Sequence, residues 1–214
     1  MDNSKRIRFL WLLGVFAPLW LSAVSVVAGA LTPGYSPVSE VVSELGARGM
    51  PYADLMNGAG FMLTGIFIIL FSLGAKRMMG NGKLAGLTSL LIALTGVGVF
   101  GSGYFPCDPG CAIENMSIPM LKHALAGLTT FAFSAVTPLV VSFHYWRSRR
   151  WGYFAYSLLT GVALLSLLSI MFSPIISGIE GLHQRAFLGI YFLWVIFFAL
   201  SIKPRQSHPQ EQPA

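Results

Sequence analysis

The chain has few charged residues. Only 10% of its 214 residues are Asp, Glu, Lys or Arg, and the acidic ones number eight. A soluble domain is charged at roughly a quarter of its positions, so the composition excludes an ordinary soluble domain. Hydrophobic residues make up 55% of the chain and the mean hydropathy is +0.68, which is typical of a protein that lies in lipid.

Familiar catalytic signatures are also missing. The sequence holds no HExxH, HxxxH or GxSxG motif, no P-loop and no pair of CxxC motifs. The segment from Gly96 to Gly101 matches GxGxxG literally, but it lies in an apolar run with no preceding strand, so it does not indicate a dinucleotide site. No internal repeat is visible, which argues against an inverted-repeat transporter. No reaction can therefore be assigned from a motif.

The chain does have six long apolar runs, near residues 9–31, 53–75, 84–105, 120–143, 152–173 and 184–202. At a rise of about 1.5 Å per residue, each run can cross a hydrocarbon core of roughly 30 Å as a helix. The sequence therefore predicts an all-α fold, a six-span transmembrane helical bundle that forms one domain over residues 1–202. Residues 203–214 are polar and are expected to form a disordered tail. Ala28-Gly29-Ala30 also fits a signal-peptidase site, but the preceding run is longer than a signal core, so a retained span is expected.

The charges predict how the bundle sits in the membrane. Of the fourteen Lys and Arg residues, only Arg48, Lys122 and Arg185 lie at the span ends that meet the first, third and fifth connections. Because short basic loops resist translocation, both termini are expected to be cytoplasmic and loops 32–52, 106–119 and 174–183 extracytoplasmic. The expected location is the cell membrane, here the bacterial plasma membrane. The cations flank spans instead of covering a soluble face, so no nucleic-acid partner is expected.

The first outer loop predicts a short amphipathic helix. Ser36 is a good N-cap and Pro37 suits the first helical position. Apolar residues then recur at helical spacing, at Val38, Val41, Val42 and Leu45. Glu40 and Glu44 would lie one turn apart on the polar side, flanked by Ser39 and Ser43. Arg48 follows Glu44 by four residues, the order that favours an ion pair along a helix.

Cys107 and Cys111 are the only two cysteines. Pro109-Gly110 between them favours a tight turn, and an extracytoplasmic compartment allows a disulfide to persist. A structural disulfide is the favoured interpretation. A redox pair and a metal site remain alternatives, although a CxxxC segment alone supplies only two soft ligands.

Two histidines lie at the predicted outer boundary. His123 follows Lys122 at the start of the fourth span, and His183 precedes Arg185 at the start of the sixth. His144 lies among arginines at the inner end of the fourth span, and His208 lies in the polar tail. These last two are not expected to form a site.

Several segments together resemble the DUF998 family of polytopic membrane proteins. They are Tyr35-Ser36-Pro37-Val38-Ser39-Glu40, Ser43-Glu44-Leu45-Gly46-Ala47, Gly103-Tyr104-Phe105-Pro106-Cys107-Asp108-Pro109-Gly110-Cys111, His123 and His183-Gln184-Arg185. The resemblance covers roughly residues 10 to 200. The family name stands for unknown function, so the resemblance implies the fold and draws attention to the outer residues without implying a reaction.

The outer residues could line one outward-opening pocket. Its ligand would be amphipathic, such as a lipid headgroup, and membrane lipids are the expected partners. Lys122 and Arg185 could hold a phosphate. The expected ligand-binding residues are Ser39, Glu40, Ser43, Glu44, Arg48, Lys122, His123, His183 and Arg185.

Other functions stay open. A membrane-embedded hydrolase or transferase acting on a lipid-like substrate would use Glu44, Asp108, His123 and His183 as catalytic candidates. No cofactor is expected, but zinc could bind His123, His183 and one or two of Glu40, Glu44 and Asp108, and haem b could take the two histidines as axial ligands. In a non-catalytic scaffold or partner subunit, pairs such as Glu44–Arg48 and Glu180–Arg185 would only fasten loops. The sequence does not determine whether the protein is an enzyme, its protein partners or its oligomeric state.

Overall fold

The computed structural model describes residues 3–112 and 116–202. Within these ranges the chain forms helices and loops and no strand. The long helices are α1 (Asn3–Leu31), α2 (Leu63–Met79), α3 (Lys83–Tyr104), α4 (Ile118–Arg147), α5 (Trp151–Ile170) and α6 (Glu180–Ser201), and a π-helix, η2 (Leu55–Met62), runs directly into α2. Six helical stretches are long and apolar enough to cross a membrane. The predicted all-α bundle of six spans is confirmed, and the predicted tail at 203–214 lies outside the described residues.

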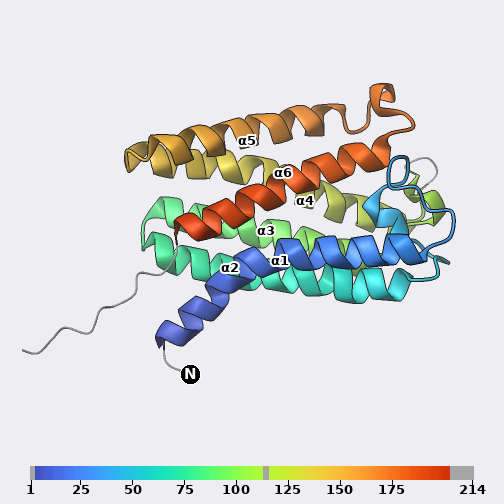
Figure 1. Ribbon diagram of the computed structural model, residues 1–214, viewed down its shortest axis with the longest axis horizontal. Helices are drawn as coiled ribbons and strands as arrows, with labels where there is room; N and C mark the ends of the chain where they lie inside the picture. The colour runs from blue at the N-terminus through green and yellow to red at the C-terminus, as the bar shows by residue number, and fades with distance from the viewer. Residues whose placement is uncertain (1–2, 113–115, 203–214) are drawn as a thin grey trace, which may run out of the picture.

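The helices lie side by side in one elongated bundle (Figure 1). The start of α1 and the end of α6 lie at one end, which we call the terminal end. The connections 32–54 and 171–179, together with residues 105–112 and 116–117, lie at the other, which we call the loop end. The loop end is the one that the charge pattern predicts to be extracytoplasmic. Consecutive long helices pack against one another, and α6 also packs against α1.

The bundle interior is rich in aromatic side chains from α6. Phe187, Trp194 and Phe198 are almost completely buried. Trp194 stacks on Phe198 with a centroid distance of 5.2 Å, and Phe198 meets Phe71 of α2 edge to face at 6.1 Å. Large aliphatic side chains such as Val26, Leu159 and Leu193 are exposed on the outside of the bundle. Such an apolar exterior is suited to lipid.

Glycines allow α3 to approach both of its neighbours closely. A Cβ atom placed on Gly96 would lie 2.8 Å from the Gly65 carbonyl oxygen of α2, and one placed on Gly98 would lie 2.6 Å from the Thr130 nitrogen of α4. Neither distance leaves room for a side chain, so the small residues set the spacing of the helices. The GxGxxG segment therefore serves helix packing.

The first loop differs from the single amphipathic helix that the sequence predicts. A turn closes from the Glu40 amide to the Ser36 carbonyl, 2.8 Å, and a separate 3-10 helix, η1 (Val42–Gly46), follows. The break lies at Val41, whose backbone is extended with φ −68° and ψ 156°. Ser36 does cap the turn, because its Oγ accepts from the Ser39 amide at 3.4 Å. Val42 and Leu45 are buried as the amphipathic pattern predicts.

The N-terminus of α6 explains this break. In a continuous helix the Pro37 carbonyl would accept from the Val41 amide, but here it accepts from the Arg185 side chain at 2.7 Å. The Val38 carbonyl likewise accepts from the Leu182 amide at 2.8 Å. Two carbonyls that a helix would use are therefore bonded to α6 instead. The N-terminal turns of α6 therefore form hydrogen bonds with the backbone of the first loop, and these bonds prevent the predicted helix from forming.

Candidate functional sites at the loop end

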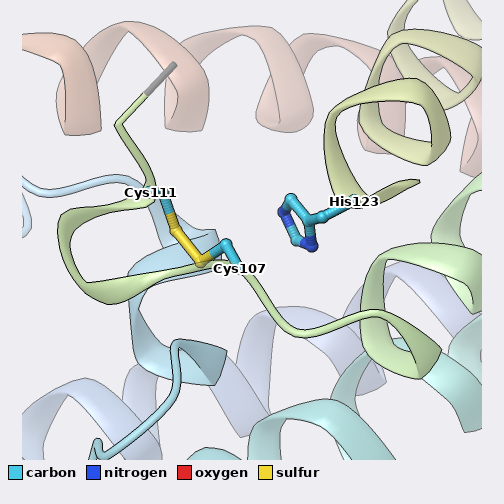
Figure 2. A group of neighbouring side chains, drawn as sticks. All are labelled: Cys107, Cys111 and His123. Atoms are coloured by element: carbon cyan, nitrogen blue, oxygen red, sulfur yellow. A yellow bond between two sulfur atoms is a disulfide. The ribbon is translucent and has the colours of Figure 1, made fainter. Parts of the chain in front are cut away.

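The two cysteines form a disulfide at the loop end, beside His123 (Figure 2). Gly110, with φ +77°, makes the tight turn between them, in a backbone conformation that favours glycine. Cys107 is completely buried and packs with Ala47 and Met120, while Met50 and Cys111 lie at the edge of this small apolar cluster. The Arg48 amide donates to the Cys107 carbonyl at 3.1 Å. The predicted disulfide therefore closes a turn over residues 107–111, and the packing of Cys107 and the Arg48 hydrogen bond hold this turn against the first loop.

Asp108 links the disulfide segment to the start of α4. The Ser117 hydroxyl donates to one of its carboxylate oxygens at 2.9 Å and the Ser117 amide to the other at 3.1 Å. The same Ser117 oxygen accepts from the Met120 amide at 3.2 Å and so caps α4. These hydrogen bonds and the charge of Arg48 lower the pKa of Asp108.

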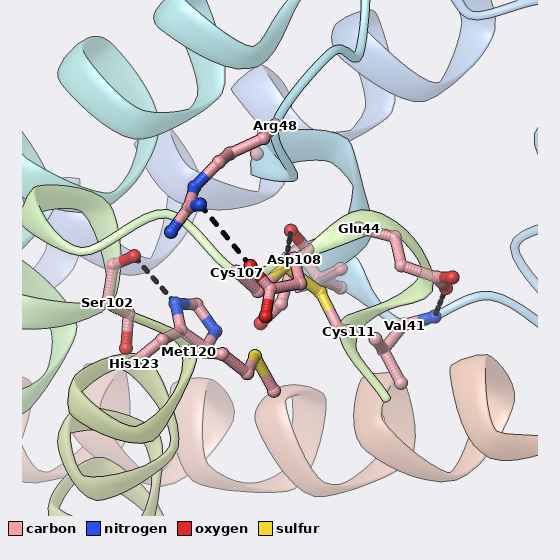
Figure 3. Close-up of a disulfide and its surroundings, with 12 residues drawn as sticks. Val41, Glu44, Arg48, Ser102, Cys107, Asp108, Cys111, Met120 and His123 are labelled. Carbon is pink, nitrogen blue, oxygen red and sulfur yellow. Dashed lines mark hydrogen bonds and ion pairs between the residues drawn. A yellow bond between two sulfur atoms is a disulfide. The ribbon is translucent and has the colours of Figure 1, made fainter. Parts of the chain in front are cut away.

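Arg48 does not pair with Glu44. Its Nη1 lies 3.4 Å from Oδ1 of Asp108, across 60 positions of sequence (Figure 3). The expected pair along a helix is wrong because the chain between Glu44 and Arg48 is a short 3-10 helix that ends at Gly46, so the two side chains do not follow one another on an α-helical face.

His123 is buried beside the disulfide. Its Nδ1 lies 3.0 Å from the Ser102 carbonyl oxygen and 2.8 Å from that of Phe105. Both oxygens can only accept, so this hydrogen-bond network assigns the proton to Nδ1 and leaves Nε2 with a free lone pair. The opposite edge of the ring faces the disulfide (Figure 2). One ligand atom each from Cys107, Cys111 and His123 lie within 4.8 Å of one another.

Three carboxylates gather between η1 and the start of α6. We call Glu40, Glu44 and Glu180 the carboxylate cluster. Glu40 accepts from the Ser36 amide, and Glu44 accepts from the Val41 amide at 2.8 Å. Burial raises the pKa of Glu44, and the charges of Glu40 and Glu180 raise it further. The cluster is therefore crowded with negative charge.

Arg185 lies close enough to this cluster for its charge to lower the pKa of Glu44, and its Nη1 and Nη2 groups are engaged by the protein. Nη1 donates to the carbonyls of Pro37, Glu40 and Gly181 at 2.7, 2.8 and 3.0 Å, and Nη2 donates to the Tyr35 hydroxyl. No ion pair with Glu180 forms. Gly181 permits the approach, because a Cβ atom there would lie 2.2 Å from the Glu40 carbonyl oxygen. Burial raises the pKa of Tyr35, although Arg185 opposes this shift.

The remaining expected residues take different positions. Ser39 is exposed, and the Ser43 carbonyl oxygen lies 3.5 Å from the Cys107 sulfur. Lys122 is exposed with its Nζ 5.2 Å from the centroid of the Phe105 ring. His183 is buried, and neither of its ring nitrogens has a hydrogen-bond partner.

The structure therefore divides the expected single site into two. Glu44 lies in the carboxylate cluster beside Arg185, whereas His123 lies with Asp108 and the disulfide. Figure 3 shows Glu44 on the far side of the disulfide from His123. Within residues 3–112 and 116–202, Cys107, Cys111 and His123 are the one group of three side chains placed to hold a metal ion. The expected zinc set of His123, His183 and carboxylates is not assembled.

One feature lies where the sequence indicated no site. A recess of about 460 Å³ at the terminal end is lined by Gly82, Lys83, Leu84, His144, Arg147 and Ser148. It forms because the turn before α3 and the end of α4 meet there. Only the basic character of both segments could have suggested it, and the same charges are explained by membrane topology.

The chain was compared with known proteins. No curated protein and no solved structure matches it. The family model described as "Protein of unknown function (DUF998)" matches residues 15–201, which include the larger part of α1, the other five membrane-spanning helices and both clusters at the loop end. The chain therefore belongs to the DUF998 family.

Proposed function

We propose that the loop end of this multi-pass membrane protein binds an amphipathic ligand whose polar group is an amine, such as an amine-bearing lipid headgroup. The carboxylate cluster supplies the charge for this recognition. Glu40 and Glu44 each use one carboxylate oxygen on the loop backbone, which leaves the other oxygen of each free to accept from a ligand. Burial is the main cause of the raised pKa of Glu44, and a positive group there would relieve the added repulsion from Glu40 and Glu180.

The engagement of Arg185 is the observation that carries this proposal. The sequence predicts a phosphate bound by Arg185, but at Nη1 and Nη2 such a phosphate would have to compete with four acceptors that the protein already places around these two nitrogens. With three carboxylates and one cation, the cluster keeps a net negative charge when all of them are ionised. An amine is therefore a better partner than a phosphate.

An apolar surface lies next to the cluster. Val38, Phe172, Ile175, Ile179 and Leu182 are exposed on the first loop, the 171–179 connection and the first turn of α6. We call these residues the apolar rim. Glu180 lies within the same stretch of chain, so carboxylates and exposed apolar side chains adjoin. Such a surface suits a ligand with a charged head and a hydrocarbon tail.

Binding is favoured over hydrolysis by the surroundings of the histidines. Among the described residues neither the His123 nor the His183 ring bonds to a carboxylate. A general acid or base oriented by a carboxylate is therefore not assembled from Glu44, Asp108 and these rings.

Native mass spectrometry of the purified protein tests the proposal. The protein is offered phosphatidylethanolamine and, separately, phosphatidylglycerol, which lacks the amine. Wild type should retain the amine lipid in preference, and the E44Q/E180Q double variant should lose this preference. Glutamine at 44 keeps an oxygen that can accept from Val41, so the loop should stay folded. D54N removes a charge from an exposed residue outside the cluster and should bind as wild type. Equal retention of both lipids, or unchanged preference in E44Q/E180Q, would refute amine recognition.

A further inference from the structure

We propose that Cys107, Cys111 and His123 form a binding site for one thiophilic metal ion when the disulfide is reduced. The ion would be of the Cu⁺ or Zn²⁺ class, which thiolate and imidazole ligands favour. This site is separate from the carboxylate cluster and does not depend on amine recognition.

The ligand geometry is almost in place. Metal–sulfur bonds of about 2.3 Å and metal–nitrogen bonds of about 2.0–2.1 Å put the ligand atoms of a tetrahedral site roughly 3.5–3.8 Å apart. One ring nitrogen of His123 and the two sulfurs lie within 4.8 Å of one another. Breaking the sulfur–sulfur bond would let the cysteines separate toward that spacing.

His123 is held in the state that a metal ligand requires. Its Nδ1 proton is directed at the carbonyls of Ser102 and Phe105, which fixes the ring and leaves the Nε2 lone pair free. Metal-bound histidines commonly donate their other ring N–H to a carbonyl in this way. The ring edge that carries Nε2 faces the disulfide (Figure 2).

The residues around the site also provide soft sulfur ligands and are largely buried. Cys107 is completely buried, and Met120 is nearly so. Met50 and Met120 pack in the same cluster as the cysteines, and thioethers are ligands that Cu⁺ accepts. The described residues of this cluster thus offer sulfur and imidazole, whereas Asp108 is occupied by Ser117 and Arg48.

A dithiol reductant would open the site by thiol–disulfide exchange. One thiolate of the reductant attacks the sulfur of Cys111, which is the more exposed of the two, and Cys107 leaves as a thiolate that takes up a proton. The second thiolate of the reductant then displaces Cys111, which also takes up a proton, and the reductant becomes a disulfide. Two electrons and two protons have been transferred to the protein. Binding of the ion releases the two thiol protons.

Titration of the full-length protein with Cu⁺ and, separately, Zn²⁺ tests the inference. The protein is reduced with a phosphine under anaerobic conditions, the phosphine is removed, and a chromogenic chelator competes for the added ion. Reduced wild type should bind one equivalent of at least one ion, and oxidised wild type should bind none at this site. The two titrations identify which ion the site prefers. X-ray absorption of the bound ion should show two sulfur ligands and one nitrogen ligand.

The variant H123N separates ligation from folding. Asparagine can place its amide N–H near the position of Nδ1, so it can still donate to Ser102 and Phe105, but it has no counterpart of Nε2. The affinity of the reduced protein should fall by at least about tenfold. H144N makes the same substitution at the terminal end and should leave the affinity unchanged. If neither ion binds the reduced protein, or if H123N binds as wild type, the inference is overturned.

Discussion

Arg185 holds the first loop against α6, so its removal should open that loop locally. Its guanidinium donates to the backbone of Pro37 and Glu40 and to the Tyr35 hydroxyl, three acceptors that lie about 150 positions earlier in the sequence. Hydrogen bonds to a charged group each contribute about 1.5–3 kcal/mol, but bonds from one side chain are not additive and Arg185 is only half-buried. We expect R185A to lower the free energy of loop opening by about 3 kcal/mol.

Hydrogen exchange measures this change. A loss of about 3 kcal/mol corresponds to roughly a hundredfold faster exchange of the amides that open with the loop. The amides of Val42 and Leu182, which bond across the interface between the loop and α6, should report it most directly. Exchange within α3 should stay unchanged. R185K should give an intermediate effect, because lysine keeps the charge without the planar fork of donors. R77A removes an exposed arginine at the terminal end and serves as the control. Equal protection of residues 36–46 in R185A and wild type would refute the assigned role.

Three further predictions concern packing and charge. G96A should lower the thermal stability of the detergent-solubilised protein by about 1–3 kcal/mol, because the new methyl group would meet the Gly65 carbonyl, whereas G86A in the same helix, where the space is open, should not. Glu44 has a raised pKa in the folded protein, so its stabilising contribution is present below its unfolded pKa and is lost as pH rises through the folded value. The protection of the first loop against hydrogen exchange should therefore fall over this pH range in wild type. E44Q should abolish this pH dependence. Asp108 has a lowered pKa, so its contribution is present above its unfolded pKa and is lost as pH falls through the folded value; D108N should remove this acid-side loss of thermal stability. Opposite pH trends in these variants, or a G96A protein as stable as G86A, would contradict these assignments.

The membrane architecture could be predicted because its signals are local. Six apolar runs of spanning length appear as six helices, and the Pro109-Gly110 turn brings Cys107 and Cys111 together as expected. The close contact of Gly65 with Gly96 also follows from small residues at helical spacing. The helix boundaries were predicted less accurately. Helix α6 begins at Glu180, so His183 and Arg185 lie within its first two turns and not at the edge of a loop.

The candidate sites could be predicted only in part, because their partners are distant in sequence and are mostly backbone atoms. Arg185 bonds to the carbonyls of Pro37 and Glu40, and no side-chain pattern identifies a carbonyl as an acceptor. The break at Val41 has the same origin, since α6 takes the carbonyls that a helix would use. Arg48 had a nearby carboxylate at helical spacing, but its partner is Asp108, which only the tertiary fold brings close. The sequence predicts these residues at one end of the bundle, but it does not show that they separate into the carboxylate cluster and the group around the disulfide.

Both proposals depend on the loop end facing the outside of the cell. There a disulfide can persist until a reductant arrives, and lipids of the outer leaflet can reach the carboxylate cluster. The most direct test places a single reactive cysteine at either end, as S39C at the loop end and S148C at the terminal end, two exposed positions. Intact cells are treated with a membrane-impermeant maleimide. S39C should be labelled, and S148C should be labelled only after the membrane is opened. Labelling of S148C but not S39C in intact cells would contradict the account.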